Sequence, residues 1–335
     1  MLKTGVLLLN LGTPNHCDNL AVYRYLTEFL MDSRVIDLPS LMRFILVHLI
    51  IVPGRYKKTA KAYRQIWMEQ GSPLLINSIA IKKALAQQLG ETYQVELAMR
   101  YGHPNLQTAL NSLSTCQMLR VIPLFPQYSS AATGSALEHF FNKISQQWNI
   151  PSVEIKHEFY HQTGFIMAVT DRIKEKLNKS IDSIDLLIFS FHGLPERHID
   201  KSACHAHCDR IAPCPDIKQD NLYCYRAQCY KTAYLIAEQL KIEPSKFIVA
   251  FQSRLGRIPW IKPYTDLLLK DLIARGIQKI AVVCPSFVAD CLETLEEVNI
   301  RMRKQWRLLG GKEFIFIPCV NDHPVWIKAL SAMVI

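Results

Sequence analysis

The stretch LLIFSFHGLPERH, residues 186–198, begins as an unbroken apolar run and ends at a histidine followed by glycine and proline. Such a run is typical of a strand buried on both faces, and α/β enzymes keep their chemistry at the carboxyl ends of parallel strands. Five of the ten cysteines follow between positions 204 and 229. We therefore expect the imidazole of His192 at the edge of a sheet, next to thiols able to bind a metal or a cluster.

Outward from this stretch, short apolar runs alternate with helical patterns along the whole chain. The runs are rich in Val, Ile and Leu and alternate little, which indicates parallel strands. The predicted strands are residues 5–11, 93–99, 119–125, 152–159, 185–191, 246–251, 279–284 and 313–317. The predicted helices include residues 21–31, 78–89, 170–177, 230–240, 264–275, 290–306 and 325–334. This rhythm predicts doubly wound α/β sheets.

The chain also resembles itself at two places. The segment LLLNLGTP, residues 7–14, is similar to LIFSFHGLP, residues 187–195. Each is a strand that breaks at a polar residue and continues with glycine and proline. The length of 335 residues fits two domains of ordinary size. We therefore expect two similar βα halves facing each other across a cleft.

Composition limits the partners and the compartment. A net charge of +10 favours anionic partners, such as acidic lipid or a polycarboxylate ligand. The basic residues are scattered and no nucleic-acid motif is present, so we expect no nucleic-acid partner. The apolar run at residues 5–11 is short for a signal peptide, and no small-residue cleavage site follows it. The apolar stretch at residues 41–52 is too short to span a membrane. These features predict a cytoplasmic protein with reduced thiols.

Three sets of polar residues each admit two interpretations. His192 is either a proton acceptor and metal ligand or a hydrogen-bonded structural residue. Glu293 and Glu297 lie opposite the apolar side of the helix predicted at residues 290–306. They either form a solvated face or act as a ladder of carboxylates that passes protons or cations. Arg55 and Arg254 suit carboxylates or phosphates, or belong to the ordinary surface charge.

The cysteine segment has the spacing Cys204-x3-Cys208-x5-Cys214-x9-Cys224-x4-Cys229. It contains no C-x2-C pair, so a zinc ribbon is a poor match. Four thiolates could instead hold a structural zinc ion or an iron–sulfur cluster, which leaves one cysteine spare.

Several motifs together resemble the ferrochelatase family. They are LNLGTP at 9–14, PQYS at 126–129 with TGS at 133–135, SFHG at 190–193, QSR at 252–254 with PW at 259–260, and PSF at 285–287 continuing to LETL at 292–295. They follow the family order and span nearly the whole chain. The resemblance implies two Rossmann-like domains, with parallel sheets, around a porphyrin cleft. The first would hold residues 1–155 and 318–335 with a porphyrin lip, and the second residues 156–317 with a cysteine-rich insertion at 200–229.

The same resemblance implies the reaction and its residues. The reaction is insertion of Fe²⁺ into protoporphyrin IX or coproporphyrin, with loss of two protons, to form haem. His192 would be the main catalytic residue and Glu293 its acidic partner, both contacting the Fe²⁺ substrate. Glu297 would continue a proton or metal path. Residues implied in binding the porphyrin are Thr13, Arg55, Tyr63, Ser72, Tyr128, Arg254 and Trp260.

Other implications concern the cofactor and the membrane. A bacterial subgroup with an internal cysteine insertion carries a [2Fe–2S] cluster, and on that pattern the ligands would be Cys208, Cys214, Cys224 and Cys229. Structural zinc remains the alternative, and the insertion is expected to stand apart from the metal-insertion chemistry. Residues 41–52 are similar to the family's apolar lip and imply peripheral membrane contact. The chain departs from many members at Cys291, where they carry histidine, and at Arg301, where some carry glutamate.

Two other functions remain open at this stage. One is a cobalt chelatase of early tetrapyrroles, which would need more cations than this aromatic, apolar set of pocket residues. The other is an iron–sulfur sensor with a degenerate pocket, against which the presence of both His192 and Glu293 argues. The sequence leaves the oligomeric state and the iron donor undetermined.

Overall fold

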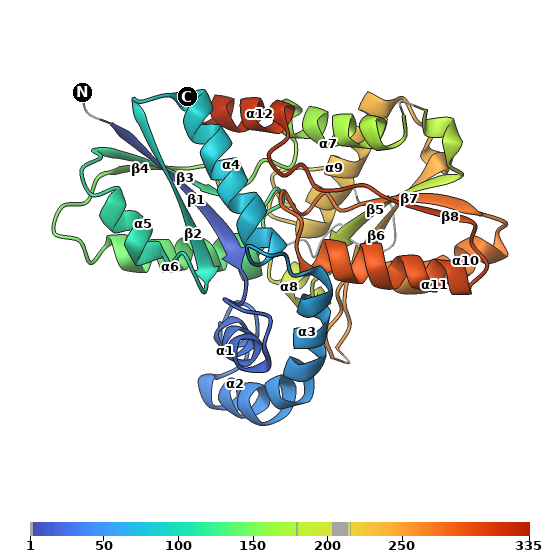
Figure 1. The fold of residues 1–335 in the computed structure, drawn as a ribbon, viewed down its shortest axis with the longest axis horizontal. Coiled ribbons are helices and arrows are strands. Elements are labelled where there is room, and N and C mark those ends of the chain that lie inside the picture. Colours follow the sequence, from blue (N-terminus) through green and yellow to red (C-terminus); the bar gives the residue numbers. More distant parts are fainter. Residues whose placement is uncertain (1–2, 179, 203–213, 215, 257) are drawn as a thin grey trace. The chain divides into compact units, whose positions relative to one another are not determined.

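Eight strands form at the eight apolar runs and build two parallel sheets, as predicted (Figure 1). The computed structural model describes residues 3–178, 180–202, 214, 216–256 and 258–335. The first sheet has the order β2-β1-β3-β4, made of β2 (Tyr93–Tyr101), β1 (Thr4–Gly12), β3 (Met118–Pro123) and β4 (Ser152–Ile155). The second has the order β6-β5-β7-β8, made of β6 (Phe247–Gln252), β5 (Leu186–His192), β7 (Lys279–Val283) and β8 (Glu313–Phe316).

The two sheets share one topology. In each, the first strand along the chain lies second in the sheet, with the next strand on one side and the third on the other. The similar segments at residues 7–14 and 187–195 therefore contain equivalent strands, β1 and β5. In both sheets the connections therefore leave this strand in opposite directions, first to one side and then to the other. Such a reversal of strand order is a topological switch point.

Helices connect the strands. Those of the first half are α1 (Asn19–Leu30), α2 (Ser40–Ile45), the π-helix η1 (Leu46–Ile51), α3 (Val52–Ile66), α4 (Pro73–Leu89), α5 (Leu106–Ser112), the π-helix η2 (Ser130–Gly134) and α6 (Ser135–Ile144). Those of the second half are α7 (Thr163–Lys176), the 3₁₀ turn η3 (Ile181–Ser183), α8 (Glu196–Asp200), α9 (Tyr225–Leu240), the 3₁₀ turn η4 (Pro244–Lys246), α10 (Thr265–Ala274), the π-helix η5 (Glu293–Met302), α11 (Arg303–Leu308) and α12 (Pro324–Val334).

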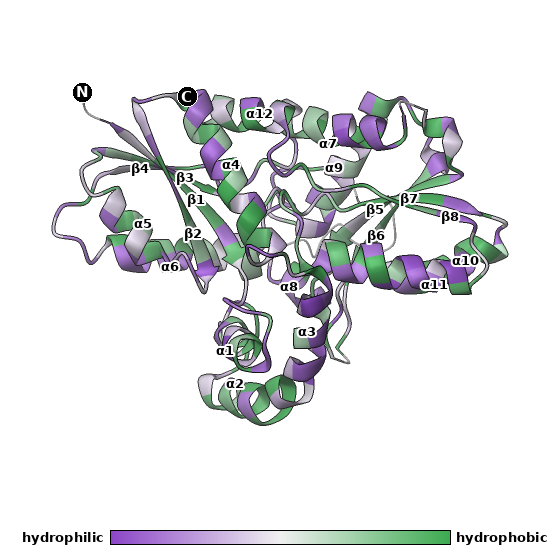
Figure 2. Ribbon diagram, viewed as in Figure 1, coloured by the Kyte–Doolittle hydropathy of each residue, from purple (hydrophilic) through white to green (hydrophobic). Residues whose placement is uncertain are grey.

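Each sheet is covered by helices on both faces. In the first sheet, α5 and α6 pack on one face around Leu7, Val121 and Phe140, and α4 contacts β1 and β2. In the second sheet, α10, η5 and α11 pack on one face around Ile188 and Trp306, while α9 contacts β6. Figure 2 shows the apolar strands of each sheet between helices whose outer sides are polar. This arrangement confirms the doubly wound α/β prediction.

The contacts divide the chain into two units, each with one sheet. The first unit holds residues up to Phe125, Ser129–Glu158 and Leu330–Ile335, and the second holds Pro126–Tyr128 and Phe159–Ala329. His192, Glu293 and Glu297 therefore belong to one unit, built around the second sheet. Among the described helices, none is both long and apolar enough to span a membrane.

Candidate active site

His192 ends β5 at the switch point of the second sheet. Its backbone N–H donates to Ser286 Oγ at 2.9 Å, in the loop that follows the neighbouring strand β7. Its carbonyl oxygen accepts a hydrogen bond of 2.8 Å from the Tyr225 hydroxyl, at the start of α9. Both sides of the His192 peptide are thus held by side chains from other elements.

The imidazole of His192 is half-buried and oriented by its own turn. Nδ1 lies 2.6 Å from the Gly193 carbonyl oxygen, so the neutral ring carries its proton on Nδ1. The lone pair of Nε2 then remains for a proton or a metal ion. The turn requires glycine at 193, because a Cβ there would lie 2.7 Å from the Gln252 carbonyl oxygen and 3.3 Å from the Trp260 ring.

Glu293 and Glu297 lie on η5, which follows β7. The helix predicted at residues 290–306 forms, but its first ten residues have π geometry and begin at Glu293. π-helices are rare and frequently occur at functional sites. Val298, Met302 and Trp306 point into the core of the second sheet, which leaves the acidic side toward the strand ends.

Glu297 is held by the loop after β6 and is not part of a solvated face. Its side chain is 20% exposed, and Arg301 lies 3.7 Å from its carboxylate. Ser253 donates twice to that carboxylate, from its N–H at 3.0 Å and from its hydroxyl at 2.6 Å. Ser253 has φ = 70°, a left-handed conformation that a non-glycine residue adopts only when its surroundings enforce it.

The predicted catalytic residues influence one another electrostatically. Burial raises the pKa of Glu297, while the hydrogen bond from Ser253 and the charge of Arg301 oppose that rise. The negative charge of Glu293 raises this pKa further, and the charge of His192 lowers it. In addition, the side-chain amide of Gln252 donates to the Glu293 carbonyl oxygen at 3.1 Å. His192, Glu293 and Glu297 therefore lie in one constellation around the ends of β5, β6 and β7.

Three further predicted site residues lie in the same unit. The buried Trp260 ring lies beside the 192–193 turn, and its Nε1 donates to the Leu255 carbonyl at 2.9 Å. Arg254 forms a 2.6 Å ion pair with Asp266 and lies over the Tyr264 ring. A substrate carboxylate would have to compete with Asp266 for that guanidinium. The half-buried Tyr128 packs edge-on against Tyr223, with ring centroids 5.4 Å apart.

The remaining four lie in the first unit. Thr13 follows β1 at the equivalent switch point, and its buried hydroxyl has no hydrogen-bond partner among the described residues. Ser72 caps α4 by accepting the Leu75 N–H at 3.3 Å, a structural role that sequence reasoning did not foresee. Tyr63 is buried edge-on against Trp67, and Arg55 is exposed on α3.

The described part of the cysteine segment brings three thiols together. Cys224 and Cys229 are fully buried, and the pKa of Cys229 is raised first by burial and further by Cys214 and Cys224. The Arg226 guanidinium lies 2.7 Å from Cys214 Sγ, where it can offset thiolate charge. Cys204 and Cys208 lie outside the described residues. Within the described ranges, no three His, Cys, Asp or Glu side chains are already arranged to hold a metal ion.

Tyr225 was missed by sequence reasoning, as was its link to His192. It stands between Cys224 and Cys229, and its hydroxyl reaches a carbonyl 33 positions earlier in the chain. The helical end of the cysteine segment therefore contacts the backbone of His192, a neighbour that the sequence did not suggest. Sequence reasoning placed Ser253 and Ser286 at strand ends but gave neither a role, because only the fold shows which side chains they reach.

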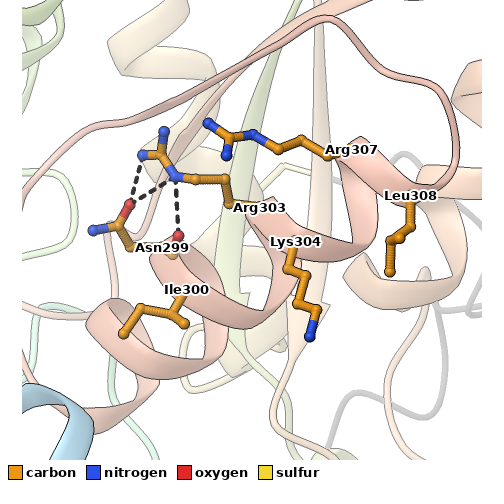
Figure 3. A pocket seen from close by; sticks show the side chains of 6 residues that line it. All are labelled: Asn299, Ile300, Arg303, Lys304, Arg307 and Leu308. Atoms are coloured by element: carbon orange, nitrogen blue, oxygen red, sulfur yellow. Dashed lines mark hydrogen bonds between the residues drawn. The ribbon is translucent and has the colours of Figure 1, made fainter.

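One pocket of about 680 Å³ lies away from this constellation (Figure 3). It is lined along η5 and α11 by Asn299, Ile300, Arg303, Lys304, Arg307 and Leu308. Asn299 Oδ1 accepts from Arg303 Nη2 at 2.6 Å, which turns that guanidinium along the helix. No predicted site residue lines the pocket, and the strand-end chemistry points to the constellation around His192 instead.

The comparisons with known proteins agree with this geometry. Two solved chelatase-fold structures are similar in fold: SirB from Bacillus subtilis with Fe³⁺ has a TM-score of 0.56 and 12% identity, covering 99% of this chain and 94% of that one. The sirohydrochlorin chelatase SirB from Bacillus subtilis subspecies spizizenii, in complex with cobalt, has a TM-score of 0.52 and 9% identity, covering 98% and 92%.

Curated sequences are much more similar. The chain is 50% identical over 333 residues to a ferrochelatase of Legionella pneumophila, covering 99% of both chains. It is 48% identical over 334 residues to a ferrochelatase of Coxiella burnetii, covering 99% of this chain and 93% of the relative. The ferrochelatase family model matches residues 3–335. The chain belongs to the ferrochelatase family.

Proposed function

We propose that the constellation of His192, Glu293 and Glu297 inserts Fe²⁺ into protoporphyrin IX or coproporphyrin. Membership of the family makes the protein a lyase-type porphyrin metal chelatase that forms haem. The observation that carries the assignment of the site is the His192 ring, whose Nδ1 is engaged by the Gly193 carbonyl while Nε2 is left for chemistry.

Insertion must remove two pyrrole protons and replace the water ligands of the metal ion. We assign the first proton to Nε2 of His192 and the second to the carboxylates of η5. Burial raises the pKa of Glu297 above its ordinary range, which suits a group that both accepts and releases protons. His192 and Glu293 would contact the Fe²⁺ substrate as it enters the ring.

Aromatic and cationic residues are proposed to contact the porphyrin. Trp260 and Tyr128 offer ring faces, and Arg254 offers a guanidinium near the same strand ends. Thr13, Arg55, Tyr63 and Ser72 are proposed contacts from the first unit. In this proposal the two units correspond broadly to the two Rossmann-like domains that the family resemblance implied, except that residues 318–329, expected in the first domain, belong to the second unit.

The matched test of the site is His192→Ala against His139→Ala, which removes another half-buried imidazole, on α6. With Zn²⁺ as a fluorescent surrogate, we expect His192→Ala to lose turnover by roughly 10²–10⁴-fold. Both variants should keep the melting temperature of the wild-type protein. If His192→Ala turns over like His139→Ala, the assignment of the base is wrong.

A cobalt chelatase of early tetrapyrroles is the second candidate. One similar fold is that of a cobalt complex, but likeness at 9% identity supports the fold alone. A carboxylate-rich substrate would need more cations than Arg254, which already pairs with Asp266. Insertion of Co²⁺ into an octacarboxylate precursor, with none of Fe²⁺ into protoporphyrin, would favour this candidate.

We also propose a [2Fe–2S] cluster on Cys208, Cys214, Cys224 and Cys229, with structural zinc as the alternative. The chemistry of the residues suits such a group, since cysteine thiolates are its usual ligands, Cys214 and Cys224 both influence the pKa of Cys229, and the Arg226 guanidinium lies 2.7 Å from Cys214 Sγ. When bound, the cluster would supply a rigid cross-link and a one-electron redox centre. A red-brown protein with visible absorption supports the cluster, whereas a colourless protein with stoichiometric zinc supports the alternative.

Peripheral membrane contact is proposed for α2 and η1, in a cytoplasmic protein. Six of their apolar side chains are exposed by 45–71%: Leu41, Met42, Phe44, Ile45, Leu49 and Ile50. Figure 2 colours most of this part of the ribbon as hydrophobic. Arg55, Lys57 and Lys58 follow on α3, where cations can meet anionic lipid headgroups. An apolar face flanked by cations is typical of segments that lie in the membrane interface.

A further inference from the structure

Tyr225 lies where the cysteine segment meets the catalytic histidine. It is the first residue of α9, directly after Cys224, and it is buried. Its hydroxyl donates to the His192 carbonyl oxygen at 2.8 Å. Ser286, which accepts the His192 N–H at 2.9 Å, also acts on Tyr225, because burial raises the pKa of that hydroxyl and Ser286 opposes the rise. Tyr225 and Ser286 together therefore enclose the His192 peptide.

The same hydroxyl is linked to the cysteine thiols. Cys229 follows Tyr225 by one helical turn on α9, and the pKa of each side chain, raised above all by burial, is also influenced by the other side chain. Cys224 and Cys229 are fully buried, and Cys214 lies against the guanidinium of Arg226. Cys224, Cys229 and the hydroxyl that holds His192 therefore belong to the first turns of one helix.

We propose that Tyr225 is a positioning residue that couples the cysteine site to His192. Metal or cluster bound to the thiols would fix the first turn of α9, and with it the hydroxyl on the His192 carbonyl. Loss of the metal would loosen that turn, and the ring of His192 would lose its orientation toward the substrate. The proposal rests on the catalytic role proposed for His192, and Tyr225 itself does not touch the reacting atoms.

The direct test is Tyr225→Phe, which removes one oxygen and keeps the buried ring. We expect kcat for Zn²⁺ insertion to fall roughly tenfold, as for the loss of one well-made hydrogen bond. The porphyrin KM, the visible absorption of the bound metal centre and the melting temperature should stay unchanged. The control is Tyr234→Phe on the same helix, whose half-exposed ring contacts Tyr230 and Phe247. Equal kcat for the two variants would overturn the proposal.

Metal removal supplies the second arm, read by hydrogen exchange as well as by turnover. Chelation should raise amide exchange at residues 191–194 in the wild type and lower its turnover. In Tyr225→Phe that exchange should already be raised, and chelation should change it little further. The coupling is refuted if chelation raises amide exchange at residues 191–194 by the same factor in the wild type and in Tyr225→Phe. If no metal insertion occurs in either protein, the proposed function fails while the exchange still decides the coupling.

Discussion

At the scale of single residues, the proposed chemistry depends on which nitrogen of His192 is free to accept a proton. The Gly193 carbonyl, 2.6 Å from Nδ1, leaves Nε2 as the basic nitrogen. The end of β6 contacts η5 at two places: Gln252 donates to the backbone carbonyl of Glu293, and the next residue, Ser253, donates to both carboxylate oxygens of Glu297. Two adjacent residues thus hold the backbone of Glu293 and the carboxylate of Glu297.

Removal of the Ser253 hydroxyl should shift the pH profile. Burial raises the pKa of Glu297 and Ser253 opposes that rise, so Ser253→Ala should raise this pKa further. The acid limb of kcat/KM should move to higher pH, since the carboxylate would stay protonated longer. Ser253→Gly also lacks the hydroxyl but suits φ = 70°, and should show the same shift with higher thermal stability than the alanine variant. An unmoved limb in both variants would contradict the role of the hydroxyl.

Glu297→Gln should separate stability from activity. A raised pKa means that folded Glu297 keeps its proton to higher pH than the unfolded chain does. Its contribution to stability therefore falls as pH rises from the ordinary glutamate pKa through the raised value, and stays low above it. Glutamine removes this cost, so the variant should gain melting temperature relative to wild type at alkaline pH and little at acid pH. Its turnover should fall by about 10²-fold. A difference in melting temperature between Glu297→Gln and the wild type that stays constant across pH would contradict the raised pKa of Glu297.

At the scale of elements, the strands were predictable and parts of the helices were not. All eight strands form at apolar runs, because a strand buried on both faces must be apolar throughout. The π geometry of η5 was not predictable, since Val298, Met302 and Trp306 fit an ordinary helical spacing equally well. The contact of Tyr225 with His192 was also invisible, because it depends on how α9 packs beside β6.

The apolar face of α2 and η1 yields a prediction about membranes. Leu49 and Ile50 are exposed by 69% and 62%, so their replacement by serine should leave the fold intact. Binding to vesicles of anionic lipid should weaken at least tenfold, given about 1.5–3 kcal/mol for each buried side chain of this size. Leu308→Ser on α11, at a side chain exposed by 78%, is the control and should bind as wild type does. If the wild type, the variant with serine at positions 49 and 50, and Leu308→Ser bind the vesicles equally, this face is not the membrane contact.

At the scale of the whole molecule, two sheets of identical strand order carry two similar strand-end motifs. In the second unit the motif contains His192, and in the first it contains Thr13, whose buried hydroxyl lacks a partner among the residues described. The repeat at residues 7–14 and 187–195 was readable in the sequence because both strands end at the same kind of turn. The roles of the two copies differ with the side chain that follows the strand.

The central claim is that this chain metallates a porphyrin at His192. The most direct measurement is anaerobic incubation of the intact protein with Fe²⁺ and protoporphyrin IX or coproporphyrin, followed by the Soret band and porphyrin fluorescence. The account predicts catalytic loss of fluorescence and formation of the haem spectrum with wild-type protein, and neither with His192→Ala. Unchanged porphyrin bands with the wild-type protein, or equal haem formation by both proteins, would contradict it.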